Sequence, residues 1–485
     1  MQQPHVVIVG GGIAGLAAAF FLRDEAVRVT LLEGSPRLGG KLSVSEIAGV
    51  AVDEGAEALL VTRPEGTALI AEAGLGDQRT VPGTTSSAIW TLGALRPLPR
   101  RQFMGVPSDM AELARSGVLS AEGVARARQD LDLPPTPRDG DVPVAGYIAA
   151  RLGEEVVDRL VDPLLGGVYA GRSAELSFDA TLPALAAASR QHGSLAAAAR
   201  SLLPPPEQAS AGTRAGGSVF TTLTGGLGML PAYLAKASGA EVRTAAVTRE
   251  LARARSGWRL TVGSAAAPEH IDADAVILAI PARPAGRLLA DVAGVSAAVT
   301  ALGEIGYASM AIVTLAYPRS AFPGPGPGLA ALGWSGYLVP AVDGRAVKAV
   351  TFSTVKWPHL AGATASGAEP LEIVRCSVGR IGEEALLQRA DDDLAALAAA
   401  ELAEATGVRG GPAAVRVTRW GGALPQYTVG HLDRVARIRA AVAAQPGLAV
   451  CGAAYDGVGI PACVATARTA VGQVMAFLAA RPPAG

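Results

Sequence analysis

A glycine-rich turn close to the start of the sequence constrains the fold more than any other feature. A β-branched run at residues 5–9 leads into a glycine-rich segment at residues 10–15, and apolar residues then recur at helical spacing. Gly10, Gly12 and Gly15 have the G-x-G-x-x-G spacing of a strand-to-helix turn that binds dinucleotides. Gly10 permits the tight turn, Gly12 lets backbone N–H groups approach a pyrophosphate, and Gly15 lets helix and strand pack closely.

An acidic residue follows the glycines at the distance that a nucleotide-binding fold requires. The β-branched run at residues 27–32 ends on Glu33, about twenty residues beyond the turn, where such a fold places the carboxylate that binds a ribose. The N-terminus of the intervening helix adds unpaired N–H donors and the positive end of its dipole for the phosphates. We therefore predict an α/β chain with a Rossmann-like dinucleotide-binding domain.

The composition excludes several other classes of protein. A net charge of −1 over 485 residues argues against a nucleic-acid binder, which usually carries a basic excess. Cys376, Cys451 and Cys463 form no C-x-x-C pair, and the five histidines show no ligand spacing, so neither a disulfide framework nor a metal site is predicted.

No basic and apolar leader is visible, and no uncharged run reaches the ~18 residues of a membrane span. We expect a cytoplasmic protein, and peripheral contact with the inner face of the membrane stays open.

The order of strand and helix patterns predicts a multidomain α+β arrangement in which the nucleotide-binding domain is discontinuous. A buried strand at residues 274–281 resumes the parallel sheet after an insertion, and residues 241–251 are predicted as one strand. The glycine-punctuated segment 164–171 is predicted as a turn between helices. The predicted domains are nucleotide-binding (1–85, 216–290 and 418–485), a mostly helical insertion (86–215) and a mixed-sheet substrate-binding domain (291–417).

Two further motifs favour a flavin over a nicotinamide cofactor. Residues 33–41 read E-x-x-x-x-x-G-G-x and residues 53–57 contain D-x-G-A, and both resemble segments of FAD-dependent oxidases and desaturases. Near the C-terminus, Pro461 suits the first turn of a helix. A helix N-terminus near Ile460 would point its positive dipole end at the pyrimidine edge of an isoalloxazine, which becomes anionic on reduction.

With these motifs, the whole chain resembles the soluble bacterial porphyrinogen oxidases of the flavin amine oxidase superfamily. Five further stretches carry the resemblance, at residues 307–311, 338–340, 352–358, 417–427 and 457–461. It implies oxygen-dependent oxidation of a porphyrinogen in haem synthesis, with hydride transferred to FAD and electrons returned to oxygen as peroxide. It implies no catalytic nucleophile and no metal. Because a cysteine precedes the flavin loop instead of matching a cysteinyl attachment site, FAD is expected to bind non-covalently.

The resemblance also implies which residues hold the cofactor. It assigns the glycine turn to the pyrophosphate, Glu33 to the ribose, Val247 to the adenine and Trp420 to the neighbourhood of the flavin. The complete implied set is Gly10, Gly11, Gly12, Ile13, Ala14, Gly15, Glu33, Gly34, Gly40, Lys41, Gly55, Ala56, Glu57, Ala58, Val247, Trp420, Val458, Gly459 and Ile460.

For the substrate, the resemblance implies Arg63 and Lys356 as contacts of the propionates, which cationic side chains bind as counter-ions. Coproporphyrinogen III is the expected substrate, on the basis of an Ala- and Arg-rich composition typical of high-GC genomes. Protoporphyrinogen IX is the alternative. A flavin amine oxidase, a carotenoid desaturase and a scaffold that uses FAD for stability stay open. The expected partners are the porphyrinogen and molecular oxygen, and a hand-over of product to the next haem-pathway enzyme stays open.

Overall fold

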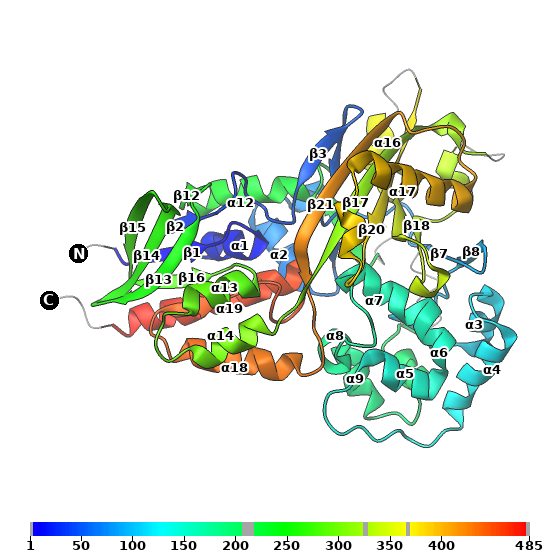
Figure 1. Ribbon diagram of the computed structural model, residues 1–485, viewed down its shortest axis with the longest axis horizontal. Coiled ribbons are helices and arrows are strands. Elements are labelled where there is room, and N and C mark those ends of the chain that lie inside the picture. Colours follow the sequence, from blue (N-terminus) through cyan, green and yellow to red (C-terminus); the bar gives the residue numbers. More distant parts are fainter. Residues whose placement is uncertain (1–2, 206–217, 324–327, 365–368, 482–485) are drawn as a thin grey trace.

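A five-stranded parallel sheet forms one half of the protein. The computed structural model describes residues 3–205, 218–323, 328–364 and 369–481 (Figure 1). Both faces of the sheet are buried, and successive residues of β1 alternate between two cores: Val6 and Ile8 pack on one side, Val7 and Val9 on the other. In spatial order the strands are β12 (Glu241–Arg243), β2 (Arg28–Leu32), β1 (His5–Val9), β16 (Ala275–Leu278) and β22 (Leu448–Val450).

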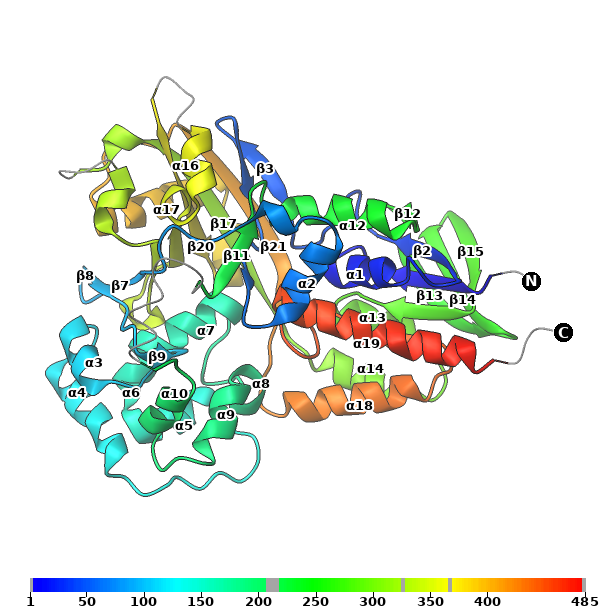
Figure 2. The ribbon, with the colours of Figure 1, turned by 180° about the vertical axis from the view of Figure 1, so that it is seen from behind.

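Helices and a small antiparallel sheet cover the two faces of this parallel sheet (Figure 2). One face is covered by α1 (Ile13–Phe21), α2 (Pro64–Glu72), α12 (Leu230–Ser238) and α19 (Ile460–Ala479). The other is covered by β13 (Thr248–Ala254), β14 (Gly257–Ser264), β15 (Ala267–Ala273), α13 (Ala282–Leu289), α14 (Ser296–Gly303) and α18 (His431–Ala443). Within the described residues, α19 is long and apolar enough to cross a membrane by length and composition, but it packs in the core against α1 and α2.

The prediction of a single strand over residues 241–251 was wrong, because the chain turns at Ala245. Ala245 has a positive φ of 53°. The N–H groups of Ala245 and Ala246 donate to the carbonyls of Ser35 and Glu33. The segment therefore splits into β12 of the parallel sheet and β13 of the antiparallel sheet, with the turn placed beside the end of β2.

A seven-stranded mixed sheet forms the second half and shifts two predicted boundaries. Its strands are, in spatial order, β21 (Ala414–Pro425), β17 (Tyr307–Pro318), β20 (Leu371–Val378), β19 (Val347–Phe352), β18 (Gly336–Leu338), β7 (Ala88–Thr91) and β8 (Ala94–Pro97). Helix α17 (Asp391–Thr406) packs on one face.

Strands β7 and β8 were predicted inside the insertion 86–215, and β21 crosses the predicted boundary at 417/418. Helix α14, predicted in 291–417, packs with α18 beneath the parallel sheet. The predicted boundary at 215/216 lies outside the described residues.

Short helices with their own apolar core form a third region, next to the mixed sheet (Figure 1). They are α3 (Met110–Ser116), α4 (Ala121–Arg128), α5 (Val144–Leu152), α6 (Glu154–Val156), α7 (Asp162–Tyr169), α8 (Phe178–Thr181), α9 (Pro183–Ser189) and α10 (Leu195–Ser201). The prediction of a turn over residues 164–171 was wrong in part: the chain stays helical to Tyr169, and the reversal comes at Ala170, whose φ is +49°.

Two small sheets lie in the segments that connect the halves. The hairpin of β3 (Val44–Ile47) and β4 (Val50–Asp53) leads into the loop 54–58, and β5 (Leu59–Leu60) then pairs with β11 (Phe220–Leu223), which also pairs with β6 (Arg79–Thr80). The loop 54–58 therefore lies between the parallel and mixed sheets, where its backbone is held from both sides.

Candidate active site

In the glycine turn, two of the three motif glycines are needed for close packing and the third borders open space. Gly10 has a φ of 110°, and a Cβ there would lie 2.4 Å from the carbonyl oxygen of Ala279. A Cβ on Gly15 would lie 1.8 Å from the carbonyl oxygen of Gly10. A Cβ on Gly12 would meet nothing within 4 Å. Gly10 and Gly15 are thus required by the contact of helix and strand, whereas Gly12 borders space that a ligand can fill.

Two helices, α1 and α19, begin at the site without a side-chain cap. The N-cap of α1 is Gly12 and that of α19 is Gly459, and neither helix has an acidic residue in its first turn. Their first N–H groups lack intrahelical acceptors and carry the positive ends of the helix dipoles. Both termini are suited to anionic or electron-rich groups. The predicted start of α19 at Ile460 is confirmed.

Glu33 lies at the end of β2, beside the glycine turn. Its carboxylate accepts hydrogen bonds from the N–H of Gly11 at 2.7 Å and of Ser35 at 2.8 Å. Val247 is 44 % exposed and lies next to Gly34, where a Cβ would be 3.5 Å from its side chain. The structure therefore brings the predicted ribose and adenine contacts together at one edge of the parallel sheet.

The second glycine motif lies against the first. Gly39 donates its N–H to the carbonyl of Gly11 at 2.8 Å, and a Cβ on Gly40 would be 3.4 Å from the Cα of Gly12. The carbonyl of Lys41 accepts from the N–H of Ala56 at 3.1 Å. Burial lowers the pKa of the Lys41 ammonium, which makes no salt bridge with a carboxylate of a described residue.

Trp420 closes the same loop from the mixed sheet. Its indole N–H donates to the carbonyl of Glu54 at 2.9 Å, and its ring lies 3.3 Å from the position of a Cβ on Gly55. The carboxylate of Glu54 accepts from the hydroxyls of Thr314 and Thr418 at 3.1 and 3.2 Å. The face of the mixed sheet that carries Thr314, Thr418 and Trp420 therefore looks toward loop 54–58.

The C-terminal loop before α19 is held by a buried tyrosine that sequence reasoning missed. The hydroxyl of Tyr427 donates to the carbonyl of Ala453 at 2.7 Å and accepts from the N–H of Gly457 at 2.8 Å. Burial raises the pKa of Tyr427, so the hydroxyl stays a donor. Val458 is partly buried beside the helical core. A guanidinium nitrogen of Arg63 lies 3.5 Å from the position of a Cβ on Gly457, so Arg63 faces this loop.

Glu57 and Lys356, predicted to contact cofactor and substrate, contact each other. The ammonium of Lys356 lies 2.6 Å from one carboxylate oxygen of Glu57, and Arg375 pairs with the other. Burial acts to raise the pKa of Glu57, but Lys356 and Arg375 outweigh it and hold the pKa at about 2. Arg375 also donates to the carbonyl of Gly55 at 2.8 Å. The side chain of Ala58 packs into the small core around Trp357.

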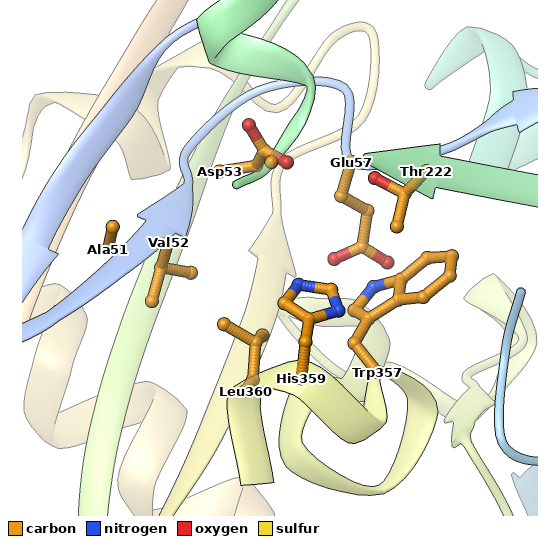
Figure 3. Close-up of a pocket in the computed structure, with 9 residues that line it drawn as sticks. Ala51, Val52, Asp53, Glu57, Thr222, Trp357, His359 and Leu360 are labelled. Carbon is orange, nitrogen blue, oxygen red and sulfur yellow. The ribbon is translucent and has the colours of Figure 1, made fainter. Parts of the chain in front are cut away.

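Beneath this charge cluster lies a small cavity of about 10 Å³, lined by β4, Glu57 and residues around α15 (Ser353–Lys356) and α16 (Pro358–Thr364) (Figure 3). The indole nitrogen of Trp357, Nδ1 of His359 and the hydroxyl of Thr222 have no hydrogen-bond partner among the described residues. Burial lowers the pKa of His359, which favours the neutral ring. A polar space of this size has room for about one water molecule, so it is too small for a substrate.

Arg375 was missed although the sequence carries a signal for it. It lies in the buried run Leu371–Val378, where an arginine is unusual, and only the fold brings it to Glu57. Tyr427 ends the stretch 417–427 that carries the resemblance, but only the fold brings its hydroxyl to the loop before α19.

The comparison with known proteins agrees with this geometry. Residues 13–475 match the family described as flavin containing amine oxidoreductase. The chain belongs to this family. Coproporphyrinogen III oxidase of Mycobacterium tuberculosis is 38% identical over 488 residues, which cover 99% of each chain. Protoporphyrinogen oxidase of Macaca fascicularis is 28% identical and covers 97% of this chain and 98% of that one. A crystal structure from Exiguobacterium sp. 255-15 has a TM-score of 0.83 at 31% identity and covers 99% of this chain and all of that one.

The chain is therefore a flavin-dependent oxidoreductase, and its residues fit FAD. The space beside Gly12 and the uncapped start of α1 suit a pyrophosphate. The uncapped start of α19 suits the flavin ring. The partly buried ammonium of Lys41 suits an anionic neighbour. The three cysteines are buried and free.

Proposed function

We propose that the protein oxidises coproporphyrinogen III to coproporphyrin III in haem synthesis, consuming three molecules of oxygen and releasing three of peroxide. The observation that supports it most strongly is the 38% identity to coproporphyrinogen III oxidase over 99% of both chains. That similarity includes the mixed sheet and the helical region as well as the nucleotide-binding turn. The nucleotide-binding parts are common to many flavoproteins, so the similarity of the other parts supports the substrate class.

In this proposal the chain binds the porphyrinogen, orients it and shields it from water. Bound FAD would accept hydride and pass the electrons to oxygen. The start of α19 would lie against the cofactor's ring, where the positive end of the helix dipole would stabilise the negative charge that reduction adds. Arg63, beside the same loop, is the proposed contact of a substrate propionate, because its side chain is 42 % exposed and its ion pair with Glu65 is long, at 3.7 Å. Val458 provides apolar surface at this point, whereas the neighbouring Ile460 is buried in the core.

Protoporphyrinogen IX is the second candidate, favoured by the 28% identity to a protoporphyrinogen oxidase over nearly the full chain. The chemistry is the same, but the substrate has two propionates instead of four. A tetracarboxylate needs more cationic contacts than a dicarboxylate, so the two candidates differ in the number of basic side chains that affect KM.

Aerobic turnover measured by porphyrin fluorescence, on both porphyrinogens in parallel and with peroxide recorded, tests the proposal. We expect a higher kcat/KM for coproporphyrinogen III and one peroxide for each two electrons removed. A preference for protoporphyrinogen IX would keep the chemistry and overturn the substrate. Bound FAD with turnover of neither compound would overturn the proposal and direct the search to amines and polyenes.

We further propose non-covalent FAD binding and a cytoplasmic location, supported by three cysteines that stay free and buried. Acid precipitation of the holoprotein should release all flavin into the supernatant. Contact with a membrane surface and hand-over of product to another enzyme are proposals that co-sedimentation with anionic vesicles and pull-down experiments would test.

A further inference from the structure

Lys348 lies in an irregular position of strand β19, on the mixed sheet. Val347 pairs with Val378 and Ala349 with Ser377, so the register between β19 and β20 shifts at Lys348. Such a bulge turns the extra side chain away from the regular alternation of the strand. Lys348 is 3 % exposed.

The side chain of Lys348 reaches the face of the sheet that looks toward loop 54–58. Met310 and Trp420 are direct partners in the antiparallel pairing of β17 with β21, so their side chains share one face. Trp420 on that face contacts loop 54–58. The ammonium of Lys348 lies 3.9 Å from the sulfur of Met310, which places it on the same face, beyond Trp420.

This buried ammonium has no carboxylate partner among the described residues. It donates to the carbonyl of Gly379 at 2.9 Å, and its other contact is the thioether of Met310. The nearby Glu383 pairs instead with Arg380. Burial, reinforced by the Arg380 guanidinium, lowers the pKa of the Lys348 ammonium to about 7. An unpaired buried cation is destabilising, so its presence calls for a function.

Helix α7 crosses this part of the sheet with small residues. A Cβ on Gly166 would meet nothing within 4 Å, and one on Gly167 would come no closer than 3.8 Å to the side chain of Leu338. Val168 is exposed although it is apolar. Helix α7, which contacts β19 and β18, therefore carries small residues and an exposed apolar side chain close to the strand that holds the lysine.

We propose that Lys348 binds a carboxylate of the substrate, as a counter-ion for one porphyrinogen propionate other than the one assigned to Arg63. The proposal rests on the proposed function and deepens it, because it adds a second cationic contact. The bound carboxylate would supply the negative partner that the lysine lacks, and the ion pair would be shielded from water. A substrate with four propionates gains more from two separate cations than a substrate with two.

Substitution of Lys348 by methionine and by glutamine tests this inference. Methionine and glutamine are similar in length to lysine but carry no charge. Methionine, in addition, leaves no unpaired buried polar group. We expect KM for coproporphyrinogen III to rise about tenfold or more, as for the loss of one charge-assisted hydrogen bond, with a much smaller change in kcat. The melting temperature of Lys348→Met should be equal to or higher than that of the wild type. Lys236→Met, an exposed lysine on α12, is the matched control.

Binding of the product separates this inference from the function itself. Coproporphyrin III and its tetramethyl ester, which has no carboxylates, are titrated by fluorescence into wild type and variants. We expect the wild type to prefer the free acid, and Lys348→Met and Lys348→Gln to lose much of that preference while they bind the ester unchanged. Equal preference in the wild type and both variants would overturn the role of Lys348. A wild type that neither turns over porphyrinogens nor binds either porphyrin would overturn the proposed function instead.

Discussion

The ammonium of Lys356 lies 2.6 Å from the carboxylate of Glu57, a residue 299 positions earlier in the chain. Arg375 completes the cluster and also holds the carbonyl of Gly55. One carboxylate thus joins α15 and β20 to loop 54–58. The charge of Lys356 is already balanced by protein, so its first role in the structure is to position that loop.

Replacing Lys356 with methionine should reduce stability more than it affects the substrate. Glu57 keeps Arg375 but loses a charge-assisted hydrogen bond in a largely buried position, so we expect a loss of about 1.5–3 kcal/mol in the free energy of unfolding. KM for coproporphyrinogen III should change little. Denaturant unfolding and steady-state kinetics, with Lys236→Met as control, check this. A large rise in KM at unchanged stability would restore the sequence-based assignment of Lys356 to the substrate.

The same cluster gives a pH dependence of defined sign. The pKa of Glu57 is about 2 in the folded protein against an ordinary value of 4.5, so its stabilising contribution is complete above pH 4.5 and is lost as the pH falls toward 2. Glu57→Gln should therefore be less stable than the wild type at pH 6–8, by about 3 kcal/mol as an upper bound. The difference between the two proteins should shrink below pH 4.5. A difference that is constant from pH 7 to 3 would contradict the ion-pair account.

Local pattern was enough to predict the glycine turn, the strand and helix around it, and the acidic residue after β2. These features depend on residues close together in sequence, and the structure shows them at one sheet edge. The Glu57–Lys356–Arg375 cluster could not be predicted, because it joins three segments that meet only in the folded chain. The same holds for Lys348, whose ammonium contacts Met310 on β17 and Gly379 after β20, residues that meet it only in the folded chain. The break between β12 and β13 was missed because alanine gives no sign of a positive φ.

Two glycine substitutions should separate cofactor binding from folding. Gly12→Ala adds a methyl group into open space at an N-cap with ordinary backbone angles, so the apoprotein should lose at most about 1 kcal/mol of stability. The methyl group would occupy the space proposed for the pyrophosphate, so FAD affinity should fall strongly. Gly15→Ala instead overlaps the backbone of Gly10 and should destabilise the apoprotein itself, by about 3 kcal/mol or more.

Titration of each apoprotein with FAD and thermal unfolding without FAD measure the two effects. The informative result is a Gly12→Ala protein that folds normally and binds FAD weakly. Wild-type affinity in this variant would show that the pyrophosphate lies elsewhere, and the assignment of the glycine turn to the cofactor would fail.

Arg63 provides the remaining test of the substrate side of the site. Its side chain is 42 % exposed, it faces Gly457 in the loop before α19, and its ion pair with Glu65 is long at 3.7 Å. An exposed pair of this length contributes little to folding, so Arg63→Ala should change stability by less than about 0.5 kcal/mol. If Arg63 binds a propionate, KM for coproporphyrinogen III should rise about tenfold. Arg63→Lys should recover only part of the loss, because an ammonium cannot form the paired hydrogen bonds of a guanidinium.

The matched control for Arg63 is Arg409→Ala, an exposed arginine that follows α17 at the edge of the mixed sheet. It removes the same charge far from the loop before α19, so it measures the effect of net charge on an anionic substrate. The titration with coproporphyrin III and its tetramethyl ester adds a second criterion, because only Arg63→Ala should lower affinity for the acid over the ester. Ionic strength does not separate the two variants, because salt weakens a direct exposed ion pair and the long-range attraction alike. Equal kinetics for Arg63→Ala and Arg409→Ala would remove Arg63 from the substrate site and leave Lys348 as the cation proposed for the propionates.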